Sequence, residues 1–173
     1  MTAEARVTAG TILVLLIGLT MLTIFYGSTS GIIVYNAPAQ PIDFFHRVHA
    51  GDKGISCYFC HRTAATAAFA GMPSTETCMR CHRVVIPHHY EIQRLHRYWK
   101  NREPVPWVRV NQLPGFVFFD HKAHILNGVK CDYCHGKVIT MDRLHQAAPL
   151  SMGWCVACHR AHKAPDDCWT CHR

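Results

Sequence analysis

All ten cysteines of this chain occur in pairs separated by two residues, and a histidine directly follows each pair. We number these CxxCH segments motifs 1 to 5 in chain order: Cys57, Cys60 and His61; Cys78, Cys81 and His82; Cys131, Cys134 and His135; Cys155, Cys158 and His159; Cys168, Cys171 and His172. Two thiols on one helical turn can each add to a vinyl group of haem, and the following imidazole then reaches the iron. Disulfides need no histidine, and zinc sites use four thiolates or separately spaced histidines. The spacing therefore predicts five covalently bound haem c groups, each with its motif histidine as the proximal iron ligand.

Four of the nine histidines outside the motifs belong to an internal repeat of the form F-x-H-x-x-H. The repeat precedes motif 1 and motif 3, and its residues are Phe44, His46 and His49 in the first copy and Phe119, His121 and His124 in the second. Its first histidine lies 11 residues before the next cysteine in one copy and 10 in the other. Histidines three residues apart share one face of a helix and can reach two different irons. We therefore predict that these four histidines are distal iron ligands.

The repeat also organises the chain. Each copy is followed by two motifs, so we expect two two-haem units, unit A (about 43–86) and unit B (about 117–162), with a fifth haem at 163–173. The haem domain would then span 43–173. So short a chain with five haems cannot build a sizeable protein core. We therefore expect a mostly α and irregular domain with little sheet, in which the haem faces supply much of the apolar interior.

Four distal histidines leave one of the five irons without a predicted distal ligand. Met152, just ahead of motif 4, is favoured by this count and by elimination would serve the haem of motif 5. Met152 could instead be a thioether that only fills space beside a haem. The other candidates are Met72, His145, His162 and the pair His88 and His89. His88, His89 and also His96 lie in the connector between unit A and unit B, and we expect all three at the surface.

The amino-terminal part of the chain is uncharged between Arg6 and Asp43. Its strongest apolar stretch, residues 7–26, has the length of about 20 residues that spans a bilayer. We therefore predict a single transmembrane anchor within residues 1–35, followed by a linker at 36–42. A cleaved secretory signal is the alternative, with "APA" at 37–39 as the cleavage site, but its apolar region would be only about 7–15 residues long.

Covalent haem attachment takes place outside the bacterial cytoplasm. We therefore expect a single-pass protein of the cytoplasmic (inner) membrane, with the haem domain on the periplasmic side. The formal net charge of +7 falls to about +2 once each oxidised haem contributes about −1 through its iron and propionates. The excess of Lys and Arg is better explained as partners of propionates, and no nucleic-acid partner is expected.

Beyond the individual motifs, the sequence is similar to two kinds of known cytochrome. The F-x-H-x-x-H segments resemble those of small c3 and c7 cytochromes. That resemblance implies that His46 pairs with His61 and His121 with His135, while His49 and His124 serve other haems, those of His82 and His159 being candidates. The segments "EPVPWVRVNQLPGFVFFDHKAH" and "PLSMGWCVACHR", with the five motifs and the apolar amino terminus, resemble the pentahaem cytochrome c subunit of bacterial alternative complex III.

The second resemblance implies an electron-transfer subunit of a quinol:acceptor oxidoreductase, not an enzyme by itself. It implies as partners an iron–sulfur protein, quinol-binding membrane subunits, a monohaem cytochrome c and a soluble electron acceptor, and it also favours Met152 as a ligand. Two alternatives remain. A quinol dehydrogenase of the NapC/NrfH type would bind quinol itself and is usually tetrahaem. A multihaem enzyme would need an iron with an open coordination position, whereas distal candidates are plentiful here.

Overall fold

The computed structural model describes residues 3–29 and 37–172. Residues 1–2 and 30–35 of the predicted anchor, Asn36 of the predicted linker and Arg173 of the fifth-haem segment lie outside the described residues. The chain divides into two compact bodies, Met1–Val34 and Tyr35–Arg173. We describe each body by itself and call the second one the haem body.

The amino-terminal body contains one helix, α1 (Ala3–Thr29). Its large apolar side chains between Ile12 and Ile24 are 51–68% exposed. Across the described residues, we find no helix that combines the length and the apolar character needed to cross a membrane. The transmembrane prediction for residues 1–35 is therefore not supported by the structure.

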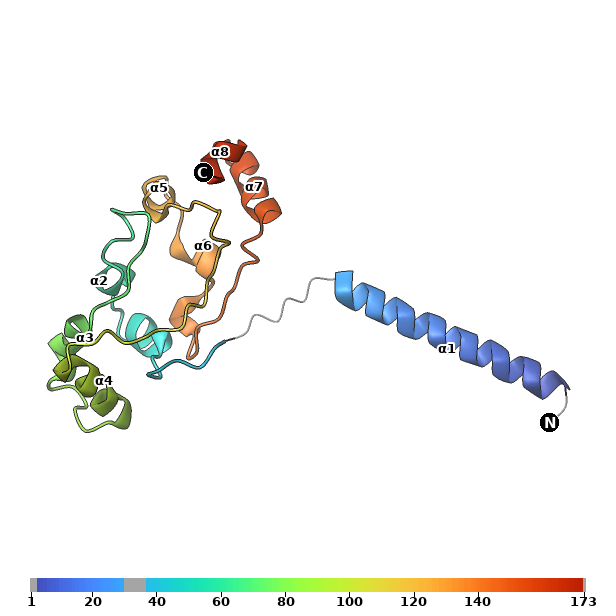
Figure 1. Ribbon diagram of the computed structural model, residues 1–173, viewed down its shortest axis with the longest axis horizontal. Coiled ribbons are helices and arrows are strands. Elements are labelled where there is room, and N and C mark those ends of the chain that lie inside the picture. Colours follow the sequence, from blue (N-terminus) through green and yellow to red (C-terminus); the bar gives the residue numbers. More distant parts are fainter. Residues whose placement is uncertain (1–2, 30–36, 173) are drawn as a thin grey trace. The chain divides into compact units, whose positions relative to one another are not determined.

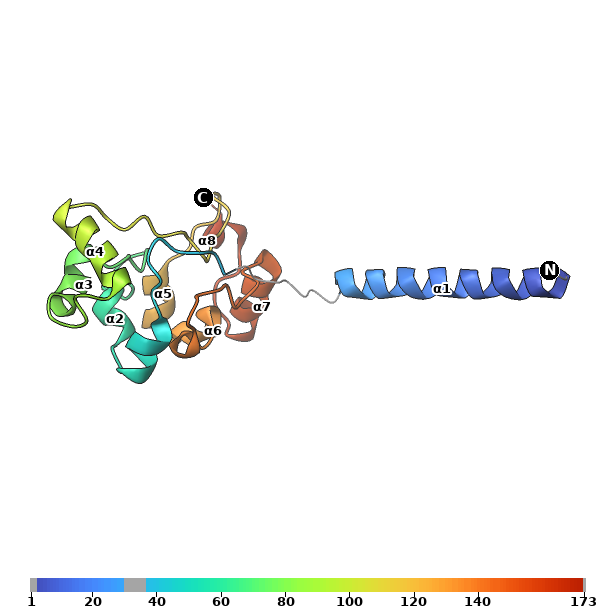
Figure 2. The ribbon, with the colours of Figure 1, turned by 90° about the horizontal axis from the view of Figure 1, so that it is seen from below.

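The haem body is built from short helices joined by long loops. Its elements are α2 (Cys57–Cys60), α3 (Thr75–His82), α4 (Tyr90–Lys100), α5 (His121–Leu126), α6 (Cys131–His135), α7 (Met152–Ala161), α8 (Cys168–Cys171), the π-helix η1 (Arg47–Asp52) and the 3₁₀-helix η2 (Val138–Thr140). Within this body, Figures 1 and 2 both show α3 and α4 at one end, α7 and α8 at the other, and α2 and α6 between them. Each of the five motif segments therefore has a helix of its own.

Side-chain caps start most of the motif helices. Ser74 caps α3 and Ser151 caps α7, and each serine lies four residues before the first cysteine of its motif. Ser56 caps α2, and Asp167 caps α8 by accepting from two backbone N–H groups. A capping oxygen satisfies backbone N–H groups that have no partner inside the helix. These caps fix where each helix begins, and hence where its cysteines lie.

The protein core is small and lies at the end of the haem body where α3 packs against α4. It contains Ile42, Met79, Ile92, Leu95 and Val105, of which Met79 is fully buried. Many large apolar side chains elsewhere in the haem body are exposed, among them Phe69 and Trp169 at 77% each. The only β-pairing among the described residues is an isolated antiparallel bridge between Val117 and His172. The prediction of a mostly helical and irregular domain with little sheet is confirmed.

The one-residue difference between the two repeat copies appears as the π-helix η1. In unit B, Val129 N–H donates to the carbonyl of His124, five residues earlier, at 3.0 Å. In unit A the matching bond, also 3.0 Å, joins Ile55 to His49, six residues earlier. The extra residue is therefore contained in the wider π-helical turns, which typically accommodate such insertions. The backbone returns to the same register before each motif begins.

Candidate haem-binding site

The neighbours of the ten motif cysteines give the motifs a linear order. Burial and then the neighbouring Cys60 thiol raise the pKa of Cys78, so motif 2 lies beside motif 1. Burial and then Cys57 raise the pKa of Cys131, so motif 1 lies beside motif 3.

The other half of the order follows from unit B. Burial, then Cys155 and Cys158, raise the pKa of Cys134, which places motif 3 beside motif 4. Burial and then Cys171 raise the pKa of Cys155, which places motif 4 beside motif 5. The spatial order of the motifs is thus 2, 1, 3, 4, 5.

Histidine rings face one another in pairs that each join a repeat histidine to a motif histidine. The ring centroids are 6.4 Å apart for His121 and His135 and lie in nearly parallel planes (4°). The rings of His124 and His159 are 6.0 Å apart at 50°, and those of His49 and His82 are 6.1 Å apart at 62°.

The fourth expected pair has no such ring contact but is still close. Burial is the main cause that lowers the pKa of His46 to about 4, and His61 is the largest electrostatic contributor, followed by His49 and His135. The structure thus places three of the pairs that the c3 and c7 resemblance implied ring to ring, and it places His46 near His61. Their assignment as iron ligands remains a prediction.

These separations fit a haem iron between the rings. Metal–imidazole bonds are about 2.0–2.1 Å long and the ring centroid lies about 1.1 Å behind the ligating nitrogen, so two axial imidazoles have centroids about 6.2–6.4 Å apart. Of the three distances between ring centroids, 6.4 Å lies in this range, and 6.0 and 6.1 Å lie at most 0.2 Å below it. The residues present therefore fit haem c.

The hydrogen bonds of the histidines leave the ligating nitrogen free. Seven predicted ligands direct Nδ1 at a backbone carbonyl oxygen: His49 at Phe45, His61 at Gly71, His82 at Val85, His121 at Ala68, His124 at Asp120, His159 at Pro165 and His172 at Phe116. A carbonyl fixes the proton on Nδ1 and leaves the Nε2 lone pair for a metal, the usual arrangement of ligating histidines. By contrast, His96 uses Nε2 itself towards the carbonyl of His82, which does not fit a ligand.

Two predicted ligands depart from this pattern. His46 has a buried Nδ1 without a hydrogen-bond partner. His135 faces a side chain, because its Nδ1 lies 3.2 Å from Nδ2 of Asn111. Sequence reasoning missed Asn111, since nothing distinguishes one polar residue in the connector from its neighbours.

One phenylalanine in each repeat holds both of its histidines. Phe44 stacks on His49 at 4.3 Å and meets His46 edge-on at 4.9 Å. Phe119 does the same to His124 at 4.5 Å and to His121 at 4.8 Å. Such contacts stabilise a pair by about 0.5–1.5 kcal/mol beyond burial. The repeated phenylalanine is therefore a positioning residue for two ligands at once.

The two units also exchange backbone hydrogen bonds. Arg47 N–H donates to the carbonyl of Met141 at 3.0 Å, and Lys122 N–H donates to that of Ala67 at 3.3 Å. Each donor directly follows the first repeat histidine, and each acceptor lies six residues after the first motif histidine of the other unit. The histidine segment of each unit is therefore anchored to the loop behind the other unit's motif helix.

The surroundings of motif 5 are less completely defined. His172 has its ring 5.8 Å from Phe116. Met152 is the first residue of α7 and is 67% exposed, and Met72 is 62% exposed. For residues 37–172, no hydrogen bond or ring contact brings a candidate distal side chain to His172. The role of Met152, and equally that of His145, His162, His88 or His89, stays a prediction.

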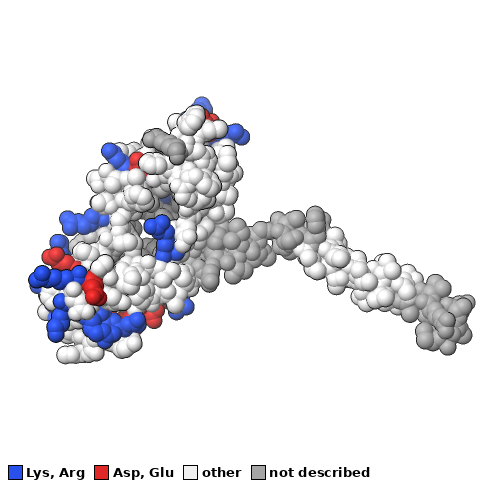
Figure 3. Space-filling view, viewed as in Figure 1, with Lys and Arg blue, Asp and Glu red and all other residues white. Residues whose placement is uncertain are grey.

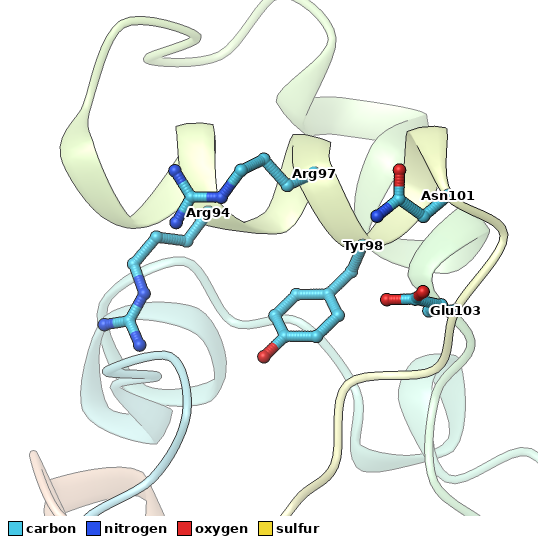
Figure 4. Close-up of a pocket in the computed structure, with 5 residues that line it drawn as sticks. All are labelled: Arg94, Arg97, Tyr98, Asn101 and Glu103. Atoms are coloured by element: carbon cyan, nitrogen blue, oxygen red, sulfur yellow. The ribbon is translucent and has the colours of Figure 1, made fainter.

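Basic residues gather at the motif 2 end of the haem body. Figure 3 shows Lys and Arg concentrated where α3 and α4 lie; the cations there are Arg80, Arg83, Arg94, Arg97, Lys100 and Arg102. A pocket of about 230 Å³ opens beside α4 and is lined by Arg94, Arg97, Tyr98, Asn101 and Glu103 (Figure 4). No predicted haem ligand lines this pocket.

Comparison with known proteins places this geometry in a family. Residues 117–173 match the model for "cytochrome c7 and related cytochrome c". Over 168 aligned residues, the chain is 30% identical to the "menaquinone reductase, multiheme cytochrome c subunit" of Nitratidesulfovibrio vulgaris, covering 82% of this chain and 80% of that protein. The matched family region contains unit B and motif 5, where the ring pairs at 6.0 and 6.4 Å lie.

Proposed function

This chain belongs to the family of multihaem c-type cytochromes, and on that premise we propose that it is the electron-transfer subunit of a quinone-linked complex of the alternative complex III type. The observation that carries the proposal is the linear order of five motifs, in which four histidine pairs are brought together. Such an order provides a route from one end of the haem body to the other. We propose that all five motifs carry haem c.

Bound haem c supplies one-electron redox chemistry. The chain's own residues determine where that chemistry occurs. The motif cysteines would anchor each group, and each of the four histidine pairs would supply two imidazoles to one iron, which would leave those irons without a place for a substrate. The Nδ1 hydrogen bonds hold the imidazoles in the tautomer that ligates through Nε2. His/His ligation favours a low potential and a Met ligand a higher one, so Met152 would make motif 5 the high-potential end.

The relative's name raises a second candidate function, because that protein is a menaquinone reductase subunit. The same chain of residues serves either direction, with electrons passing from quinol to a soluble acceptor or from a soluble donor to menaquinone. The potentials decide between them. We favour quinol oxidation because the segment around Met152 resembles alternative complex III, where an iron–sulfur protein and a monohaem cytochrome c accompany the pentahaem subunit.

We also propose that the protein acts at the cytoplasmic membrane, with the haem body on the periplasmic side. Covalent haem attachment outside the cytoplasm and the exposed apolar side chains of α1 support this location. Apolar surface of this extent is normally covered by lipid or by a partner. Fractionation of cells tests the proposal: recovery of the full chain in the cytoplasm rather than with the membranes would contradict it.

The experiment that tests the function uses the complex isolated from membranes through a tag on the full chain. Menaquinol is added anaerobically, and haem reduction is followed in the α-band. We expect rapid reduction and co-purification of membrane subunits. As the control, membranes from cells that lack this chain should transfer no electrons from quinol to an added soluble cytochrome, whereas membranes that contain it should. Unchanged transfer in that control would refute the proposal.

The same experiment separates the two alternatives. A NapC/NrfH-type protein would be reduced by quinol as an isolated chain, without its partners. A multihaem enzyme would show a high-spin iron that changes on addition of nitrite or hydroxylamine. We expect neither result, because the paired histidines favour six-coordinate irons throughout unit A and unit B.

A further inference from the structure

Asn111 lies in the connector between the units and contacts one of the predicted iron ligands. Its amide Nδ2 is 3.2 Å from Nδ1 of His135. Its Oδ1 is buried and has no hydrogen-bond partner. The oxygen and nitrogen of an asparagine amide have nearly the same shape and can exchange places by a half-turn. Of these two orientations, only the one with Oδ1 facing His135 accepts the Nδ1 proton.

The chemistry of the neighbouring ligands selects this orientation. Seven of the other predicted ligands direct Nδ1 at a carbonyl oxygen. His135 can bind iron through Nε2 only if its proton is on Nδ1, and that proton needs an acceptor. The turned amide of Asn111 provides the acceptor and gives Oδ1 its missing partner.

The connector is held so that Asn111 reaches the ring. Gln40 donates to the carbonyl of Val108 at 3.0 Å and accepts from the Val108 N–H at 2.9 Å. This two-point contact fixes the backbone three residues before Asn111. Oδ1 of Asn111 is buried and His135 is half-buried. A hydrogen bond between them is therefore shielded from much of the competing water.

We propose that Asn111 is a positioning residue that sets the tautomer and basicity of His135, and so tunes the potential of the haem at motif 3. Motif 3 occupies the middle of the spatial order, so every electron that passes between the ends must pass it. His135 is the one predicted ligand whose Nδ1 partner, among the described residues, is a side chain. The middle of the route is thus the place where a single substitution can alter a ligand hydrogen bond. The inference rests on the proposed haem ligation but not on the quinone-linked activity.

The test is an equilibrium redox titration of the full-length holoprotein, with low-temperature EPR of the oxidised state. A carboxylate accepts more strongly than an amide and stabilises the oxidised haem. Asn111→Asp should therefore lower one of five potentials by on the order of 59 mV, a tenfold change for a one-electron couple. Asn111→Leu removes the acceptor and should raise the same potential, by an amount that corresponds to a severalfold change in the equilibrium constant of reduction. If the Asn111→Leu protein fails to mature, Asn111→Ala replaces it, and the same rise in potential is expected.

The matched control is Gln112→Asp, which puts the same charge on the adjacent, exposed residue. It should change no potential by more than about twofold in equilibrium constant, since an exposed charge is screened. Unchanged potentials in both Asn111→Asp and Asn111→Leu would overturn the proposal. So would an equal shift caused by Gln112→Asp, because that result means a through-space charge effect. Loss of quinol-linked activity does not enter this readout, so failure of the proposed function is recognised separately.

Discussion

Units A and B place their histidines in the same way, but the contacts around those histidines differ. In both, a phenylalanine contacts two histidines, the first of which lies near the next motif along the chain, while the second faces the motif after it. The stacking distances differ by only 0.2 Å, at 4.3 and 4.5 Å. The surroundings differ much more. His121 has the carbonyl of Ala68 on its Nδ1, whereas the equivalent His46 has no partner there.

This contrast teaches that ligand placement and ligand tuning are separable. The repeat and the motif spacing set where the imidazoles lie, and they are shared by the units. The hydrogen bond on the far nitrogen sets how basic each imidazole is, and it comes from whichever loop is adjacent. Two copies of one motif can therefore hold haems of different potential without any change in the ligands themselves.

Removing the second repeat histidine should give the largest effect and test whether the units are equivalent. His49→Ala and His124→Ala should each convert one of five low-spin irons to high-spin, since each leaves an iron without its distal ligand. EPR of the oxidised holoprotein measures the fraction. The double variant should convert two irons. If either single variant leaves every iron low-spin, the pairing in that unit is wrong.

Met152 is a candidate iron ligand in unit B that has no counterpart in unit A. The residue follows the capping Ser151, and the matching position after Ser74 in unit A is Thr75. If Met152 ligates iron, Met152→His should lower the highest potential by more than 59 mV, a tenfold change in the equilibrium constant. Thr75→His is the control and should leave all potentials in place. A highest potential unchanged in Met152→His means that Met152 only fills space.

Gly51 exposes a difference in packing. A Cβ at this position would collide with the backbone carbonyl of Ile139, where η1 of unit A meets η2 of unit B. Gly51→Ala should therefore destabilise the holoprotein by about 1–3 kcal/mol through overpacking, although alanine is otherwise the better helix former. Leu126→Ala on the exposed face of α5 should change stability by less than about 0.5 kcal/mol. Thermal unfolding compares the two variants. Equal losses of stability would mean that the packing of η1 against η2 does not restrict residue 51.

The phenylalanines should give the smallest and most symmetrical effect. Phe44→Leu and Phe119→Leu should each cost about 0.5–1.5 kcal/mol and alter the EPR signals of two haems, those of the same unit. Phe45→Leu is the neighbouring control, because Phe45 is 41% exposed and should change no signal. A change confined to one haem would show that the ring positions one histidine rather than two.

The features that depend on repeats and on short residue spacings could be predicted from the sequence. The CxxCH motifs, the F-x-H-x-x-H pairs and the small core predicted a helical, sheet-poor multihaem cytochrome, and both the fold and the family confirm this. The transmembrane reading of residues 1–35 was not supported, although an isolated helix does form there. Which haem each ligand serves remains a prediction, which the ring distances support.

What the sequence could not provide depends on contacts between distant segments. Nothing around Arg47 indicates that its N–H meets the carbonyl of Met141, because backbone groups are the same at every residue. The contact of Asn111 could not be predicted for a similar reason, since its partner His135 lies in another segment. The π-helix η1 followed from a one-residue mismatch that the sequence did contain, but several loop conformations would have absorbed it.

The exchanged bonds between the units have a consequence for how the protein is made. The segment that begins with Arg47 finds its acceptor in Met141, which leaves the ribosome only after three of the five motifs have been synthesised. This contact between unit A and unit B can therefore form only after most of the chain has been synthesised. We expect a truncated chain that ends before unit B to lack it, and to be cleaved faster by protease at the segment around Arg47 than the full chain.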